Sequence, residues 1–173
     1  MLIFLDTEYT NMTERDLVSL AMVSEDGKQE IYIEIEDFPQ ERCSSFVERS
    51  VLPYLGQQPV HSVKLSELSQ VLALWFAELP RSVFIGCDSI YDWEILIDIL
   101  QNQRPVNLKG RVDLRPLIDS AEFHRAVENY HCDTKPWHHA LHDARAHRTG
   151  WLAWMVSRSG KSHALPKYDF TDQ

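Results

Sequence analysis

Short hydrophobic runs and alternating segments along the chain predict five strands. Apolar runs of about four to eight residues are typical of buried strands, and alternation is typical of half-buried ones. The expected strands are Met1–Leu5, Asp16–Glu25, Lys28–Glu36, Val83–Gly86 and Gly110–Leu114. In the third, isoleucines alternate with Glu30, Tyr32, Glu34 and Glu36, which predicts a half-exposed strand towards a sheet edge. The Asp26-Gly27 pair ahead of it predicts a hairpin.

Hydrophobic residues at helical spacing predict helices between and after these strands. The expected helices cover residues 41–55, 67–79, 92–100, 114–130 and 138–156. Ser66 is the expected N-cap of the second helix, and Asp92 gives the third the acidic first turn that the helix dipole favours. Residues 131–137 are expected to form a loop. A meander of three strands, followed by alternating helices and strands, predicts an α/β fold with a mixed sheet.

Length and composition place the chain among globular proteins of one domain. Its 173 residues suit a single core, expected over residues 1–156, with a polar tail over 157–173. No apolar run reaches the length of a membrane span, and no basic stretch precedes the first apolar run as in a signal peptide. The three cysteines are far apart and form no ligand pattern, so we expect free thiols and a cytoplasmic protein with no membrane partner.

The charge is unevenly distributed. The net charge is −9, but residues 1–100 hold 6 basic and 18 acidic residues, whereas residues 101–173 hold 11 and 8. Seven of the eight histidines also lie in the second part. A protein acidic overall can still bind a polyanion through a local basic face and bound cations. Tight binding of long duplexes by charge alone is not expected.

Four acidic residues at the ends of predicted elements suggest a metal site. Asp6 and Glu8 follow the first strand and point to the same side, because side chains alternate along a strand. Asp92 begins a helix, and Asp143 lies in the first turns of the last helix, just after His138. Neighbouring carboxylates repel each other unless a cation such as Mg²⁺ or Mn²⁺ lies between them. Several carboxylates, two cations about 3.5–4 Å apart and a base are what metal-dependent phosphodiester hydrolysis requires.

Three motifs carry a resemblance to a known family. They are Leu5-Asp6-Thr7-Glu8, the segment from Gly86 to Asp92, and the segment from His138 to Arg145 with its His, four residues and Asp-Ala-Arg. In this order and spacing the chain, from residue 1 to about residue 156, resembles the DEDDh 3′-5′ exonucleases. Ribonuclease T, oligoribonuclease and the proofreading subunit of bacterial DNA polymerase III belong to that family, and the chain is similar to its compact exoribonuclease-like members.

The resemblance implies a fold, a reaction and a set of roles. The fold would be ribonuclease-H-like, with a five-stranded mixed β-sheet flanked by α-helices. The partner would be the 3′ end of single-stranded RNA or DNA, with nucleoside 5′-monophosphates as products and two Mg²⁺ or Mn²⁺ ions as cofactors. Asp6 would bridge both metals, Glu8 and Asp143 would complete the site nearest the attacking water, and Asp92 would hold the second metal. His138 would be the general base, because an imidazole pKa near 6.5 suits proton abstraction at neutral pH.

Four further residues are the expected substrate contacts: Thr7, Tyr9, Asp88 and His139. Tyr9 is placed to stack on a terminal base. Asp88 stands where the family usually has Asn, so it could instead hold a metal through water.

The identity of the base stays open between two histidines. His139 and Asp143 lie four residues apart, which puts them on one face of a helix and favours His139 as the partner of Asp143. The family places the base ahead of the helix, which favours His138.

Other functions are also compatible with parts of the sequence. Asp6 could be the covalent nucleophile of a haloacid-dehalogenase-like phosphatase, or the chain could be a nucleic-acid-binding protein with an inactive site. A zinc site from His138, His142 and a carboxylate would lack a further His or Cys at the usual spacing. The tryptophans of the last helix would allow a homodimer.

Overall fold

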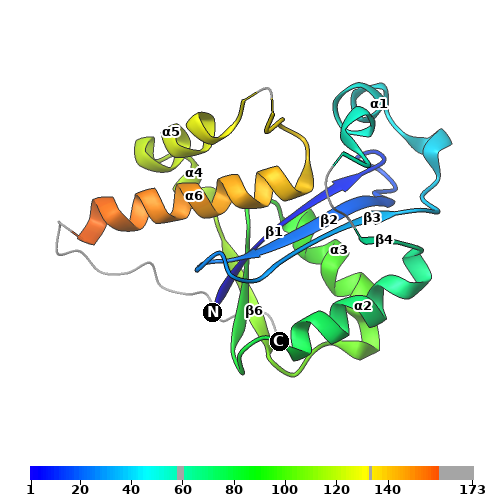
Figure 1. Cartoon of the computed structure of the whole chain (residues 1–173), viewed down its shortest axis with the longest axis horizontal. Helices are drawn as coiled ribbons and strands as arrows, with labels where there is room; N and C mark the ends of the chain where they lie inside the picture. Colours follow the sequence, from blue (N-terminus) through cyan, green and yellow to red (C-terminus); the bar gives the residue numbers. More distant parts are fainter. Residues whose placement is uncertain (58–60, 133, 160–173) are drawn as a thin grey trace.

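The computed structural model describes residues 1–57, 61–132 and 134–159, which form an α/β fold around a six-stranded mixed sheet. The strand order is β4-β3-β2-β1-β5-β6 (Figure 1). Its strands are β1 (Leu2–Tyr9), β2 (Leu17–Ser24), β3 (Glu30–Ile35), β4 (His61–Val63), β5 (Val83–Cys87) and β6 (Leu108–Asp113). Strand β2 is antiparallel to both neighbours, and the other neighbouring pairs are parallel.

The sheet has one strand more than the sequence predicts. Strand β4 pairs in parallel with β3, so β3 is not at the edge of the sheet. The expectation of five strands is therefore wrong, whereas the third strand lies next to the edge strand, towards the edge as predicted. A three-residue strand has too few positions to show an alternating pattern, and only its pairing with β3 identifies it. The hairpin at Asp26-Gly27 is confirmed: β2 and β3 are antiparallel, and Gly27 has a φ of 72°.

The helices differ from the predicted ones mainly at their ends. They are α1 (Ser45–Ser50), α2 (Leu65–Ala77), α3 (Ile90–Leu100), α4 (Arg115–Ile118), α5 (Ala121–Tyr130) and α6 (Ala140–Ser159), with 3₁₀ turns η1 (Gln40–Arg42), η2 (Leu52–Tyr54) and η3 (Gln101–Gln103).

Two predicted helices are each divided, and two other boundaries move. The segment 41–55 consists of α1 between two 3₁₀ turns, and 114–130 is divided where Ser120 caps α5. Lys64 replaces Ser66 as the N-cap of α2, and Ser89 caps α3 ahead of Asp92. Helix α6 continues to Ser159, so the first residues of the predicted tail are helical; residues 160–173 lie outside the described part.

Helices cover both faces of the sheet (Figure 1). Strand β1 alternates between two hydrophobic clusters: Ile3 and Leu5 pack with residues of α2 and α3, whereas Leu2 and Phe4 pack with residues of α4, α5 and α6. Alternation along the strand carries Asp6 to the α6 side as well. The core thus decides which helix faces the first acidic residues.

Helix α6 lies across the sheet and is fixed to the β2–β3 hairpin. Arg145 forms two hydrogen bonds to Glu30, at 2.8 and 2.6 Å, and the Trp151 indole N–H donates to Glu25 at 2.8 Å. Tyr32, expected on an exposed face, is 4% exposed and packs with alanine, valine and leucine residues of β2 and α6. That expectation is wrong because α6 covers this face.

Trp151 and Trp154 belong to the core and not to the surface. Both are buried against residues of β1, α4 and α5, and their rings lie 5.5 Å apart. The homodimer suggested by these tryptophans therefore has no support from them. Cys43, Cys87 and Cys132 are free thiols, as predicted. Within the described ranges, every helix is too short or too polar to cross a membrane.

Candidate metal centre

Three of the predicted acidic residues meet at one end of β1. Asp6 and Glu8 project from β1, and Asp143 projects from the first turn of α6. Each offers one carboxylate oxygen, and the three oxygens lie within 4.8 Å of one another. Residues 135 or more positions apart in the chain are thus brought together as the sequence predicts, because α6 covers the side of β1 to which Asp6 and Glu8 point.

A loop histidine and a main-chain amide orient Asp143. The main-chain N–H of His139 donates to Asp143 Oδ2 at 2.8 Å, and His131 Nε2 lies 3.4 Å from Oδ1. The other ring nitrogen of His131 lies 3.1 Å from the carbonyl of Lys135. The loop before α6 therefore fixes the direction of the Asp143 carboxylate.

Asp92 approaches from the opposite layer of the molecule. It lies in α3, is only 3% exposed, and accepts a 2.6 Å hydrogen bond from the hydroxyl of Thr7. Thr7 alternates with Asp6 and Glu8 along β1, so its side chain points towards α3. The Thr7 hydroxyl, an expected substrate contact, is thus engaged in holding Asp92.

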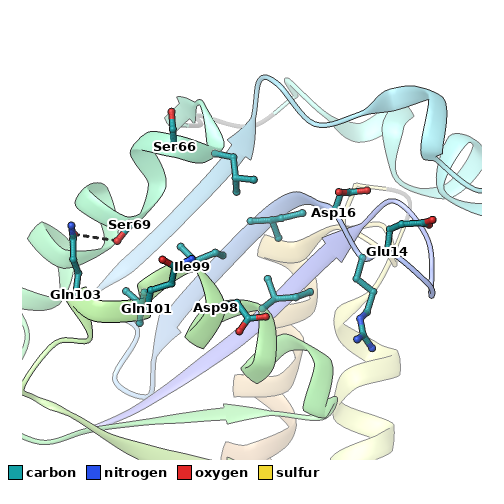
Figure 2. Close-up of a pocket in the computed structure, with 13 residues that line it drawn as sticks. Glu14, Asp16, Ser66, Ser69, Asp98, Ile99, Gln101 and Gln103 are labelled. Carbon is teal, nitrogen blue, oxygen red and sulfur yellow. Dashed lines mark hydrogen bonds between the residues drawn. The ribbon is translucent and has the colours of Figure 1, made fainter.

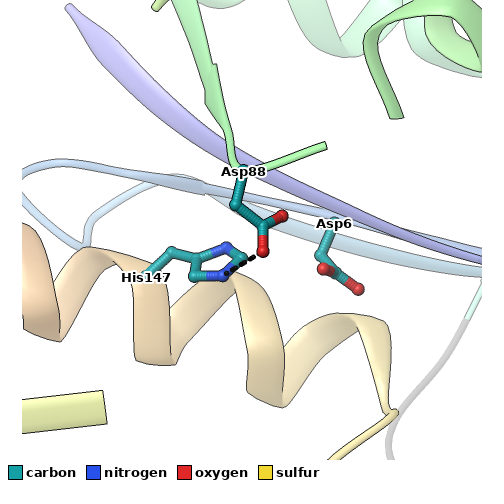
Figure 3. A group of neighbouring side chains, drawn as sticks. All are labelled: Asp6, Asp88 and His147. Carbon is teal, nitrogen blue, oxygen red and sulfur yellow. Dashed lines mark ion pairs between the residues drawn. The ribbon is translucent and has the colours of Figure 1, made fainter. Parts of the chain in front are cut away.

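A second group of metal-type ligands shares Asp6 with the first. It consists of Asp6, Asp88 and His147, whose ligand atoms also lie within 4.8 Å of one another (Figure 3). His147 Nε2 lies 3.5 Å from Asp88 Oδ2. His147 is not among the site residues that the sequence predicts. Its place one turn after Asp143, on the same face of the helix, is the signal that could have identified it.

Burial and mutual repulsion raise the pKa values of the central carboxyl groups. Burial, followed by the charges of Asp143, Asp92 and other acids, raises the pKa of Asp6 well above its ordinary value. Burial, followed by the charges of Asp143 and Asp92, also raises the pKa of Glu8 well above its ordinary value. Burial raises the pKa of Asp92 to about 7 and that of Asp143 to about 6, although their hydrogen bonds from Thr7 and His139 act in the opposite direction.

Asp88 and His147 form a different electrostatic unit. Burial acts against both charges, but their ion pair outweighs it, so the pKa of Asp88 is lowered and that of His147 is raised. The rest of the cluster has an excess of negative charge, which is the environment that binds divalent cations. Carboxylate oxygens suit Mg²⁺ and Mn²⁺, whereas an imidazole is also a typical ligand of zinc and iron. The donor set fits a divalent cation without selecting one.

The three histidines around the start of α6 occupy different environments. The ring of His139 is buried against Tyr32 at 4.9 Å, and His142 lies 3.3 Å from the hydroxyl of Tyr130. Both pKa values are lowered by burial, that of His142 to about 4. His138 is exposed, has a φ of 61°, and stands edge-on to Phe46 at 4.8 Å. Among the described residues, neither of the two ligand groups includes His138.

The predicted stacking residue Tyr9 lies at the end of β1, where it is partly buried. Its hydroxyl donates to the sulfur of Met12 at 3.4 Å. Burial, and then the charges of Asp92 and Glu8, raise its pKa.

A separate cavity of about 600 Å³ lies between α2, α3 and the turn after β1 (Figure 2). Glu14, Asp16 and Asp98 line it, together with serine, glutamine and aliphatic side chains. None of the predicted site residues borders this cavity. The acidic centre therefore lies outside this cavity.

Comparison of the chain with protein-family models and with curated proteins gives no match. The assignment of a function depends on the residues themselves.

Proposed function

We propose that the chain is a metal-dependent 3′-5′ exonuclease that acts on single-stranded nucleic acid, with RNA as the first substrate to test. The observation that carries the proposal is the position of Asp6, which belongs to two neighbouring groups of ligand atoms. Two-metal phosphodiester hydrolysis uses cations about 3.5–4 Å apart, and a carboxylate common to both ligand groups would hold two cations close together. Without β4, the strands form a five-stranded mixed sheet, which is consistent with a ribonuclease-H-like fold.

Each ligand group would hold one cation. Asp6, Glu8 and Asp143 would hold the first, and Asp6 with Asp88 and His147 would hold the second, with Asp92 close behind. Bound cations would supply positive charge to the phosphate and a water of lowered pKa. Asp88, which differs from the usual Asn of the resembled family, thus acquires a role as a ligand partner of His147.

His138 remains the proposed general base. It is the exposed histidine directly ahead of α6, and partial desolvation lowers its pKa, so the neutral form that accepts a proton predominates at neutral pH. Its left-handed backbone conformation, at φ 61°, is uncommon for a residue with a side chain and marks the loop that would carry the imidazole to the carboxylates. His131 acts on Asp143 and is a positioning residue.

The first experiment follows divalent-metal dependence with an Asp6→Asn variant. Asp6→Asn removes a charge from both ligand groups, so cleavage should fall by more than about 100-fold, since even partners that only orient ligands cost 10–100-fold. Asp98→Asn, at an exposed carboxylate of α3, is the matched control and should leave the rate unchanged. Mn²⁺ or Mg²⁺ should support cleavage and EDTA should abolish it. Full activity in EDTA, or in Asp6→Asn, would refute the proposal.

The same assay gives the direction of attack. A 5′-labelled single strand should give a ladder of shortened products, and a 3′-labelled strand should release labelled mononucleotide at once. Strands of matched RNA and DNA sequence rank the two substrates. Cleavage within a circular single strand would contradict exonuclease action.

A further inference from the structure

A second opening lies beside the acidic centre, between α1 with η2 and the loop that leads into α6. The cavity has a volume of about 450 Å³ and is lined by Arg49, Ser50, Tyr54, His131, Trp137 and His138, with Cys132 and Pro136. Of these residues, only His138 belongs to the three exonuclease-like motifs. The cavity is large enough to hold one nucleoside, because ligand sites typically start at about 300 Å³.

His131 connects this cavity to the carboxylates. His131 lines the cavity, and its Nε2 lies 3.4 Å from Asp143 Oδ1. That ring nitrogen is buried. A molecule in the cavity would therefore lie one side chain away from the proposed metal ligands.

Trp137 offers a stacking surface in the cavity. One face of its indole stacks on His131, with ring centroids 3.8 Å apart and an angle of 22° between the planes. The residue is nevertheless 47% exposed, so the opposite face is accessible. Exposed aromatic side chains that extend a stack are the usual platform for bases of single-stranded nucleic acid. The indole is held in place by His131, which keeps the entropic cost of stacking low.

Arg49 supplies the positive charge. It is exposed, and among the described residues no ion pair or hydrogen bond to a carboxylate involves it, in contrast to Arg42, which pairs with Asp16. A guanidinium matches the geometry of a phosphate and holds it by two hydrogen bonds.

We propose, on the basis of the proposed exonuclease function, that this cavity is a nucleoside subsite. It takes the base of one of the last two nucleotides of the strand, stacked on Trp137, while Arg49 binds a neighbouring phosphate. The scissile phosphate then lies at the carboxylates next to Asp143. The contacts of Trp137 and Arg49 contribute substrate binding and not the chemical step.

Steady-state kinetics on a short single strand in Mn²⁺ test the subsite with Arg49→Gln and Trp137→Ala. Each substitution should raise KM by about fivefold or more, as for the loss of one stacked base or phosphate contact, with kcat within about twofold of wild type. Arg81→Gln is the matched control, because Arg81 is exposed just before β5, at the end opposite Asp88. Circular dichroism verifies that each variant is folded. An unchanged KM in both variants would overturn the proposal.

Strands with one abasic nucleotide distinguish base stacking from a general effect. If the base stacks on Trp137, its removal at one of the last two positions should abolish the KM difference between wild type and Trp137→Ala. A difference that persists at both positions would overturn the subsite.

A binding measurement distinguishes failure of the subsite from failure of the exonuclease function. If wild type cleaves nothing, the exonuclease function fails, but fluorescence anisotropy of a labelled strand still reports binding. Trp137→Ala should then weaken binding of the intact strand and leave that of the abasic strand unchanged. Equal binding of the intact strand by wild type and Trp137→Ala would overturn the subsite independently of cleavage.

Discussion

Asp143 receives its hydrogen bond from the main-chain N–H of His139, at 2.8 Å, and not from the imidazole of that residue. The His139 ring is instead 4% exposed and packs against Tyr32. A buried ring that already fills space in the core has a structural role, whereas an exposed ring beside a cavity is free to act on a substrate. The residue environments therefore favour His138 over His139 as the general base.

Paired alanine variants test this choice. His138→Ala should lower kcat by about 10²–10⁴, the usual effect of removing a general base, while Mn²⁺ affinity measured by calorimetry stays near wild type. His139→Ala should keep most of its activity but unfold at lower denaturant concentration, because it removes a buried ring that contacts Tyr32. If His139→Ala is inactive and His138→Ala is active, the four-residue spacing to Asp143 was the better guide.

Helix α6 is the element that assembles the centre, because it carries both Asp143 and His147. Its position depends on hydrogen bonds to the β2–β3 hairpin and on close packing against α5. At Gly150, a Cβ atom would lie 2.9 Å from three ring atoms of Phe123, which is fully buried. The absence of a side chain at this position allows the two helices to approach.

Gly150→Ala should therefore destabilise the fold, although alanine is the better helix former. Overpacking a core costs about 1–3 kcal/mol, which exceeds the gain of about 1 kcal/mol from helix propensity. Urea unfolding should show a lower midpoint with an unchanged slope. In Gly110→Ala, the added Cβ would lie 3.9 Å from Phe84, an ordinary contact, so this control should stay near wild type. A stability gain in Gly150→Ala would contradict the packing argument.

The whole molecule concentrates negative charge at one end of its sheet, which makes cation binding and folding interdependent. In the metal-free protein, the pKa of Asp143 is raised from 3.8 to about 6 and that of Asp92 from 3.8 to about 7. The folded state therefore holds protons that the unfolded state has released, and this contribution to stability is lost as pH rises through 6 and 7. His131, His139 and His142, whose pKa values are lowered, contribute in the opposite direction.

The difference between Mn²⁺ and EDTA isolates the two ligand groups, which contain the carboxylates and His147, because the other three histidines lie outside both groups. Protons compete with cations for the raised carboxyl groups, so Mn²⁺ should raise the melting temperature little at pH 5 and by several degrees at pH 7.5. The effect of Mn²⁺ on the melting temperature should grow mainly between about pH 6 and 7. Differential scanning fluorimetry across this range measures it. An equal effect of Mn²⁺ at both pH values would mean that the carboxylate cluster does not bind it.

Local patterns in the sequence determined the class of the fold and part of the site. Alternation along one strand places Asp6 and Glu8 on the same side, and an Asp-Gly pair between two hydrophobic runs favours a hairpin; both consequences follow from backbone geometry within a few residues. The order of strands and helices likewise fixed the α/β class. The family resemblance and its reaction remain predictions.

Only the tertiary structure decided which distant groups meet. The pairing of β4 with β3, the burial of Tyr32 under α6, and the contact between Asp88 and His147 each join segments that are far apart in the chain. Such contacts depend on how α6 crosses the sheet, which is set by packing summed over many side chains. The cavity beside Trp137 has the same origin, because α1 with η2 and the loop before α6 form its walls only after both have packed onto the sheet.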